Sequence, residues 1–441
     1  MFPSMPQRPM TRRPFTAIAV LAAGCAVVPA TASAAADRVP GEVVVKYNRA
    51  TTAGLSRPHG PVVRKVKDVD QALAALRRRD DVAYAAPNVM ARAAGYVPND
   101  PGRKGTTPAG WQNTQWNFAG PFGVRAPEAW ELLNTLGRPG GKGVVIAVLD
   151  TGIAYRNRGG YRASPDLDPK RFIKGYDFVG RDPYPLDRNG HGTHIASTII
   201  ENTNNGVGLT GLAYGARVMP VRVLNDAGEG DAFAIAQGVR HAARKGVDII
   251  NMSLEFSADV RALEIPELLD AIDYAHRRGA LVVGASGNEG TRKVAYPARA
   301  DNVMSVASVT EHGCVSDFSN QGRGLDIAAP GGGEDAPYAD DPNCRPDEPA
   351  GRDIYQVTLT GPRSNRRFGI PGTYQGTSMA AAHVSGVAAL VLASGTLGAN
   401  PSPRALERHL EATSRDLGPK GPDSRYGAGL IDAQAATAPL P

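Results

Sequence analysis

The sequence predicts an α/β fold: a doubly wound, mostly parallel β-sheet with helices on both faces. Short apolar runs, each suited to a strand buried on both sides, alternate along the chain with longer segments of helical periodicity. The chain has 441 residues, 42% of them hydrophobic, and 51 glycines, enough for a large core and many tight turns. Together these observations favour one large α/β domain, preceded by a smaller α+β unit.

Residues 1–34 predict an export signal. Arginines precede an apolar stretch at 15–28, and the tripeptide at 32–34 fits a signal-peptidase site. A twin-arginine route through Arg12-Arg13 and lipoprotein attachment at Cys25 stay open as alternatives. The apolar stretch is too short for a transmembrane helix, so we expect a secreted protein with no stable membrane insertion of its mature form.

Residues 35–95 predict the smaller unit. Residues 41–47 and 81–85 have strand character, and residues 69–79 have the spacing of an amphipathic helix. This segment carries 11 basic and 6 acidic residues. Because the net charge of +6 belongs to the N-terminal segments, residues from 96 onward are slightly acidic, which argues against a nucleic-acid partner.

The large domain begins near residue 96. The apolar runs that predict its buried parallel strands are 144–150, 217–223, 247–252, 281–285 and 303–307. Residues 231–245 and 266–278 predict helices, the second opening with a proline, a favoured residue of the first turn. Residues 331–372 are richer in Gly, Pro and acids, and predict a surface insertion.

Cys314 and Cys344 are the cysteines of the exported part. In an oxidising compartment they predict one disulfide, with two unpaired small hydrophobic residues as the alternative. No CxxC or Cys/His spacing is present, which argues against a structural zinc site.

Three glycine-bearing motifs carry the chemistry. They are Val148-Leu149-Asp150-Thr151-Gly152, Asn189-Gly190-His191-Gly192-Thr193-His194 and Gly376-Thr377-Ser378-Met379-Ala380. A serine becomes a strong nucleophile when a histidine removes its proton, and the histidine needs a carboxylate to hold its tautomer. Taken singly, Asp150 and Ser378 would also suit helix caps, whereas the set predicts a serine hydrolase. The glycines flanking His191 predict close approach of the backbone to a substrate.

The three motifs and their chain order resemble the subtilase family. The segment Tyr96–Pro101 resembles the mature N-terminus of its thermitase branch, and the resemblance covers about residues 40–435. It implies a secreted, monomeric serine endopeptidase acting on protein and peptide substrates. It also implies that residues 35–95 are a propeptide that assists folding, is cleaved near Gly95–Tyr96 and then inhibits the enzyme.

The resemblance assigns four catalytic roles. Ser378 would be the nucleophile, His191 the general base and Asp150 its orienting carboxylate, while the Asn288 amide would face the oxyanion. His194 is expected to be a packed helix residue. Ala382 replaces a proline that is usual in the family, and we expect the helix to stay intact.

The resemblance also implies a substrate-binding set and a calcium site. The substrate-binding residues would be Ser253, Leu254, Glu255, Gly287 and Glu289. Calcium would be held by Asp100, Asp166 and Asn205 and by the carbonyls of Thr203, Val207 and Leu209. A second site at Asp177, Asp182 and Asp187 is doubtful, and a solvated acidic loop is expected there.

Glu255 replaces a usual glycine, and Glu289 lies beside Asn288 in the sequence. One hypothesis is that these acids broaden the preference at P1, the residue whose carbonyl is attacked, to Lys and Arg; the alternative is surface solvation. Two other functions stay open: a dedicated processing protease with a narrow substrate range, and a non-catalytic binding protein on the same scaffold.

Overall fold

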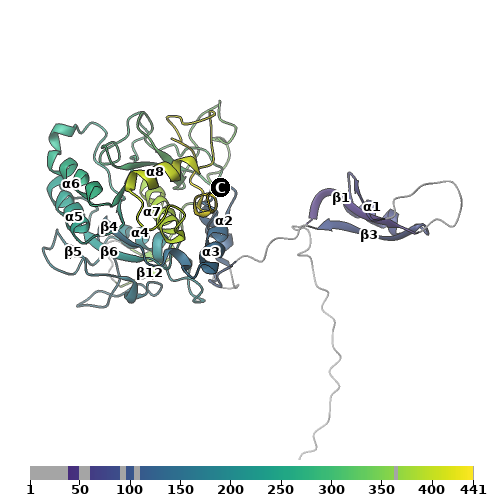
Figure 1. The fold of residues 1–441 in the computed structure, drawn as a ribbon, viewed down its shortest axis with the longest axis horizontal. Coiled ribbons are helices and arrows are strands. Elements are labelled where there is room, and N and C mark those ends of the chain that lie inside the picture. The colour runs from purple at the N-terminus through teal and green to yellow at the C-terminus, as the bar shows by residue number, and fades with distance from the viewer. Residues whose placement is uncertain (1–37, 49–59, 90–95, 104–109, 362–365, 441) are drawn as a thin grey trace, which may run out of the picture. The chain divides into compact units, whose positions relative to one another are not determined.

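The computed structural model describes residues 38–48, 60–89, 96–103, 110–361 and 366–440. The chain divides into two compact units, Met1–Ala93 and Ala94–Pro441, which are described separately below (Figure 1). The predicted signal segment, with Arg12, Arg13 and Cys25, lies outside the described residues, as does Gly95 of the predicted cleavage site.

The first unit is a three-stranded antiparallel sheet in the order β2-β1-β3, with one helix. Its elements are β1 (Arg38–Tyr47), β2 (Val62–Lys65), α1 (Val69–Arg77) and β3 (Val82–Val89). Asp68 caps α1 by accepting from the backbone N–H of Gln71 at 2.9 Å. Leu73 and Leu76 pack from α1 onto Val43 and Val45 of β1. The predicted strands and helix are present, and β2 was not predicted.

The second unit is built on a seven-stranded parallel sheet in the order β10-β9-β8-β7-β4-β6-β5. Its strands are β4 (Val145–Asp150), β5 (Tyr176–Asp177), β6 (Arg217–Arg222), β7 (Ile249–Met252), β8 (Leu281–Ala285), β9 (Met304–Val309) and β10 (Ile327–Pro330). The sheet confirms the predicted α/β class and all five predicted strands. The edge strands β5 and β10 were missed because runs of 2 and 4 residues carry little periodicity.

Helices cover both faces of this sheet (Figure 1). They are α2 (Trp116–Ala119), α3 (Ala126–Thr135), α4 (His191–Ile200), α5 (Ala232–Arg244), α6 (Pro266–Arg277), α7 (Thr377–Ser394), α8 (Pro403–Ala412) and α9 (Ala433–Thr437). Alternate residues of β4 enter the two cores: Ala147 and Leu149 pack with α5 and α6, whereas Ile146 and Val148 pack with α4 and α7. Helices α5 and α6, which were predicted from residues 231–245 and 266–278, therefore share one face.

Helix α7 is the central helix of the other face. It is apolar all round and nearly all of its residues are buried, as expected of a helix inside a core. Among the described residues it is the one helix long and apolar enough to cross a membrane. Ala382 is fully buried within it and the helix is continuous, in agreement with the expectation for that substitution.

The predicted disulfide is present between Cys314 and Cys344. It ties the segment after β9 to the first part of the 331–372 insertion. The expectation of a surface insertion is wrong for the second part, because Ile354, Gln356 and Thr358 are fully buried. Here β11 (Thr358–Leu359) pairs with β12 (Phe368–Gly369), and β11 packs beside α4. The second part of the insertion therefore packs against α4, the helix that begins with His191.

Candidate active site

The candidate site lies at the carboxyl edge of the parallel sheet. The strand order changes direction at β4: the chain passes from β4 to the edge strand β5 and back to β6 on one side, and then crosses to β7 and runs outward to β10 on the other. Ligand sites of open α/β sheets form where the strand order reverses in this way. Asp150 is the last residue of β4, and Ser253 and Asn288 follow the ends of β7 and β8, which brings all three to one edge.

Buried Asp150 and partly exposed His191 form a hydrogen-bonded pair. His191 Nδ1 lies 2.8 Å from Asp150 Oδ1 and 3.0 Å from Oδ2. Asp150 is fully buried, and its Oδ1 also accepts from the backbone N–H of Thr151 at 2.7 Å. With the ring proton on Nδ1, the Nε2 atom of the imidazole is the one left to accept a proton.

The glycines around His191 bring strand and helix together. A Cβ at Gly192 would lie 2.2 Å from the carbonyl oxygen of Gly152 and 3.0 Å from Asp150 Cβ. Gly190, with φ of 108°, precedes the first residue of α4 in a conformation that favours glycine. The missing side chain at Gly192 admits the residues at and after the end of β4, a reason for glycine that the sequence analysis did not give; close approach to a substrate stays a prediction.

Asp187 organises the loop before His191, a role that the sequence analysis missed. It is 1% exposed, and its Oδ1 accepts from Thr151 Oγ1 (3.0 Å) and from the N–H groups of Asn189 (2.9 Å) and Gly190 (3.1 Å). Its Oδ2 accepts from the N–H (3.0 Å) and hydroxyl (2.6 Å) of Thr193. The spacing of Asp187 two residues before Asn189 was the available signal, since a short acid before a tight turn often binds the amides that follow it.

The expected solvated acidic loop is therefore wrong for two of its three carboxylates. Asp187 is buried as described, and Asp177 is 4% exposed and lies 2.8 Å from Arg222 Nη1. Only Asp182 is exposed. Asp187 therefore binds groups of its own loop and of Thr151, and Asp177 is paired with Arg222.

The two histidines of the motif have opposite electrostatic surroundings. Burial opposes the charged form of His191, but the charge and hydrogen bond of Asp150, helped by Asp187 and Glu255, outweigh it and raise the pKa of His191. Burial lowers the pKa of His194 to about 3, and its Nε2 bonds the carbonyl of Ile354 at 3.0 Å. His194 is fully buried and stacks on Tyr374, as expected of a packed helix residue.

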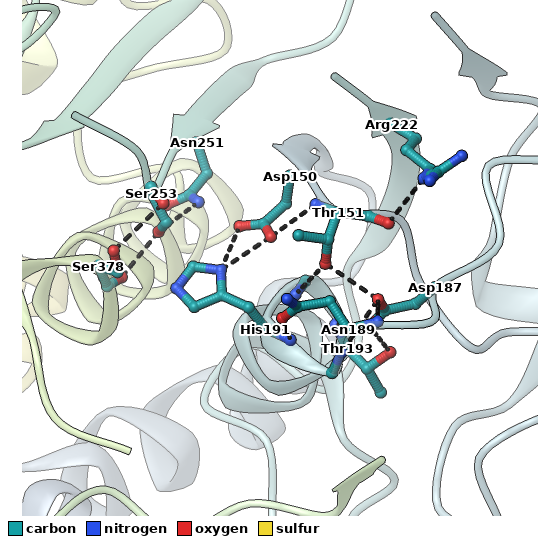
Figure 2. Close-up of polar contacts among 12 residues, drawn as sticks. Asp150, Thr151, Asp187, Asn189, His191, Thr193, Arg222, Asn251, Ser253 and Ser378 are labelled. Carbon is teal, nitrogen blue, oxygen red and sulfur yellow. Dashed lines mark hydrogen bonds and ion pairs between the residues drawn. The ribbon is translucent and has the colours of Figure 1, made fainter. Parts of the chain in front are cut away.

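Ser378 is the second residue of α7, and Figure 2 shows the imidazole of His191 lying between it and Asp150. A helix N-terminus concentrates unpaired N–H groups and partial positive charge. The Ser378 hydroxyl donates to the carbonyl of Ser253 at 3.2 Å, and the Ser253 hydroxyl donates to the carbonyl of Ser378 at 2.7 Å. These reciprocal bonds join the first turn of α7 to the segment after β7.

Asn288 is held with its amide nitrogen toward the cleft. Its Oδ1 accepts from the backbone N–H of Thr377 at 2.9 Å and from the Thr377 hydroxyl at 3.1 Å. Its Nδ2 donates to Glu255 Oε2 at 2.9 Å. Burial, with the charge of Glu289, raises the pKa of Glu255, while the bonds from Asn288 oppose this shift.

A cleft of about 520 Å³ joins these groups. Its lining includes His191, Ser378 and Asn288, together with Ser253, Leu254 and Glu255 of the predicted substrate-binding set. The other two predicted residues lie outside this lining. Glu289 Oε2 accepts from the backbone N–H of Ala258 at 3.1 Å, and the Gly287 N–H donates to Thr377 Oγ1 at 3.3 Å.

The predicted calcium ligands gather around two buried carboxylates. Asp100 accepts from the N–H groups of Asn204 (2.8 Å) and Asn205 (3.0 Å), and Asp166 accepts from Asn205 Nδ2 (2.7 Å) and the Leu209 N–H (3.2 Å). Burial raises the pKa of both carboxyl groups, that of Asp166 to about 7. Among the ion pairs of the described residues, neither has a basic partner.

This donor set fits a hard cation, because calcium prefers carboxylate, amide and carbonyl oxygens. The loop closes tightly on Asp166: a Cβ at Gly208 would lie 2.2 Å from Asp166 Oδ2. Thr203 and Val207 lie in the same loop. Within the described ranges, no three His, Cys, Asp or Glu side chains are close enough to hold a metal on their own, so the carbonyl and amide oxygens would have to complete the set.

Comparison with known proteins agrees with this geometry. The model of the subtilase family, peptidase family S8, matches residues 141–429. A thermophilic serine proteinase from Bacillus sp. (strain AK1) is 35% identical over 333 residues, covering 76% of this chain and 69% of that protein. Thermitase from Thermoactinomyces vulgaris is 34% identical over 305 residues, covering 69% of this chain and 88% of thermitase.

A solved structure agrees as well. A protease from Pseudoalteromonas arctica PAMC 21717 superposes with a TM-score of 0.61 at 31% identity, covering 78% of this chain and 99% of that one. The non-catalytic alternative is thereby set aside. The chain belongs to the subtilase family and is a subtilisin-like serine endopeptidase.

Proposed function

We propose that this subtilase is a secreted, self-processing endopeptidase in which Ser378 is the nucleophile, His191 the general base and Asp150 the carboxylate that orients it. The observation that carries the proposal is the hydrogen bond of 2.8 Å between buried Asp150 and His191, which lines the same cleft as Ser378. The raised pKa of His191 suits a group that must take and return a proton near neutral pH.

In the first half of the reaction the Ser378 oxygen attacks the scissile carbonyl carbon while His191 Nε2 removes the hydroxyl proton. Asp150 stabilises the imidazolium that forms. His191 then gives the proton to the leaving amine as the peptide bond breaks, leaving an acyl-enzyme. In the second half a water molecule attacks the ester with His191 again as base, and Ser378 recovers its proton.

Asn288 Nδ2 and the backbone N–H of Ser378 are the donors we assign to the oxyanion. Asn288 is turned toward the cleft by Thr377, and the Ser378 N–H belongs to the first turn of α7. Donors fixed in advance stabilise charge that develops in the transition state without reorganising. Ser253 and Leu254 would bind the extended substrate backbone beside them.

Residues 35–95 are proposed to be the propeptide and residues 1–34 the export signal. The folded part of the first unit, β1 to β3 with α1, has its own small core, as a separately folding inhibitor would need. Calcium would be held by Asp100, Asp166, Asn205 and the carbonyls of the 203–209 loop, and it would supply positive charge between two buried carboxylates.

A processing protease with a narrow substrate range is the second candidate. The observation that favours it is the acidic cleft, where Glu229 and Glu255 are among the lining residues. A casein digest separates the two candidates, since a broad ladder of peptides is expected of a general protease and little cleavage of a processing enzyme.

The test of the proposed function is self-cleavage. Residues 35–441 are expressed as wild type and as Ser378→Ala, with calcium, and intact mass and N-terminal sequence are measured. Wild type is expected to lose the segment before Tyr96, whereas Ser378→Ala stays full length. If both folded proteins stay uncut, self-processing through Ser378 is refuted.

A further inference from the structure

Glu255 lies where an oxyanion would need to be stabilised. Its Oε2 accepts from Asn288 Nδ2 at 2.9 Å, and the same nitrogen is the side-chain donor proposed for the oxyanion. The oxyanion donor of this chain therefore has a carboxylate partner before any substrate arrives.

The Asn288 amide cannot avoid this contact by turning over. Its Oδ1 is fixed by both the N–H and the hydroxyl of Thr377, at 2.9 and 3.1 Å. A flipped amide would place its NH₂ donor against the backbone N–H of Thr377, which can only donate. A substrate carbonyl must therefore displace Glu255, and a negative carboxylate left nearby would repel the negative charge of the tetrahedral intermediate.

The charges around Glu255 make a cation its best partner. His191 and Glu289 are close enough to shift its pKa, and Glu229 lines the same cleft. Among the described residues that line the cleft, none is Lys or Arg. Partial burial of the carboxyl group raises the pKa of Glu255 above the usual glutamate value, so a positive charge brought by the substrate would stabilise its charged form.

The two glutamates that were considered together in the sequence have different contacts. Glu289 Oε2 accepts from the backbone N–H of Ala258 and so stabilises the loop that follows β7. Both residues are exposed, but the carboxylate of Glu255 contacts Asn288, the proposed oxyanion donor. Of the pair, Glu255 is the one placed to respond to a substrate.

We propose that Glu255 is a specificity-determining latch: it holds Asn288 Nδ2 in the free enzyme and releases it when a Lys or Arg side chain of the attacked residue pairs with the carboxylate. The proposal rests on the proposed function, in which Asn288 binds the oxyanion. A cationic substrate side chain both neutralises the repulsion between Glu255 and the oxyanion and frees Asn288 Nδ2. A neutral substrate must displace Glu255 without forming an ion pair in return.

The test uses the processed enzyme and matched peptides that differ only at the attacked residue, Arg, Lys or Met. Wild type is expected to prefer Arg and Lys over Met, and Glu255→Gln to lower the Arg:Met ratio of kcat/KM by about tenfold, the scale of one partly buried charged contact. Part of that change should be an increase for the Met peptide, which a merely structural residue would not give.

Two variants separate charge from contact. Glu255→Asp keeps the charge but shortens the side chain by one methylene, so it should speed cleavage of the Met peptide while retaining a preference for Arg. Glu229→Gln removes an equal charge from the same cleft without contacting Asn288, and should change the Arg:Met ratio by no more than about twofold.

The pH profile gives an independent readout. The charge of Glu255 raises the pKa of His191, so the acid limb of kcat/KM should move to lower pH in Glu255→Gln. An unchanged Arg:Met ratio in Glu255→Gln, or an equal loss of kcat on all three peptides, would overturn the latch. Wild type that cleaves none of them would instead refute the proposed function.

Discussion

The two sides of the catalytic cleft differ in how firmly their polar groups are held. On the side of the proposed base, Asp150 and Asp187 are both buried, and Asp187 alone accepts five hydrogen bonds from the loop around His191. On the side of the proposed oxyanion donors, Asn288 and Glu255 are exposed and are linked by one hydrogen bond.

This difference matches the demands of the two steps. The proton acceptor needs one tautomer and one orientation throughout, which buried carboxylates enforce. The oxyanion donor must wait for each substrate, and an exposed side chain can exchange one partner for another. Geometry is therefore fixed on the base side, while selectivity can be adjusted on the oxyanion side.

The largest effect is expected when the carboxylate charge of Asp150, beside the proposed base, is removed. Asp150→Asn keeps the shape of the side chain but donates to Nδ1, so the imidazole would hold the wrong tautomer. We expect kcat to fall on the order of 10⁴-fold with little change in KM. Steady-state kinetics on one neutral peptide measure this, and a loss below tenfold would mean that Asp150 does not orient the base.

Removing the oxyanion donor comes next. Asn288→Ala deletes Nδ2, and we expect kcat to fall on the order of 10²–10³-fold with KM nearly unchanged. Because this variant also frees Glu255, the Arg and Met peptides should both be measured. A loss confined to KM would contradict the role given to Asn288.

Breaking the Asp187 network should cost both stability and rate. Asp187→Asn turns one acceptor into a donor that faces the donors of Thr193, and we expect about 2–3 kcal/mol less stability from the unmatched buried groups. Urea unfolding in a Ser378→Ala background avoids self-digestion. Asp182→Asn is the matched control, since Asp182 is exposed and should leave the unfolding midpoint where it is.

Calcium removal should lower the thermal stability of the protein through a site away from the cleft. If Asp100 and Asp166 hold an ion, chelation should lower Tm on the order of 5 °C, because a bound ligand stabilises the folded state. Calorimetry of Ser378→Ala with calcium or with a chelator measures the shift. Asp100→Asn should have the lower Tm under both conditions, and a full response to calcium in that variant would contradict the assigned ligand.

The smallest expected effect is a shift in the midpoint of the pH dependence of kcat/KM. Activity needs neutral His191, and the raised pKa means that kcat/KM should rise with pH through a midpoint above the ordinary histidine value of 6.5. This midpoint is located by measuring kcat/KM of wild type across pH, with a peptide substrate whose own groups do not titrate. A midpoint below 6.5 would mean that Asp150 does not stabilise the charged ring in solution.

The sequence predicted what local patterns encode. Buried strands such as β8 have continuous apolar runs, and Asp150, His191 and Ser378 lie in long motifs, so both could be read from the chain. Asp187 was taken for part of a solvated loop because its burial depends on how the loop before α4 folds back over β4. No local pattern reports such a contact.

Two further outcomes depended on packing between distant segments. Residues 356–359 lie within a stretch rich in Gly and Pro, but they are buried, and Glu201, which follows α4, accepts from the Val357 N–H at 3.0 Å. The contact between Glu255 and Asn288 joins residues 33 positions apart. The sequence pointed to an unusual acid at position 255, but its partner became visible only in three dimensions.

The most direct test of the central claim is to locate and time the reaction of the nucleophile. Wild type that has processed itself, and His191→Ala cleaved before Tyr96 by added wild type that is then removed, are treated with a fluorophosphonate probe. The labelled residue of each protein is identified by peptide mass spectrometry. We expect one adduct, on Ser378, with labelling at least about 10³-fold slower in His191→Ala. An adduct on another residue, or equal labelling rates in the two proteins, would contradict it.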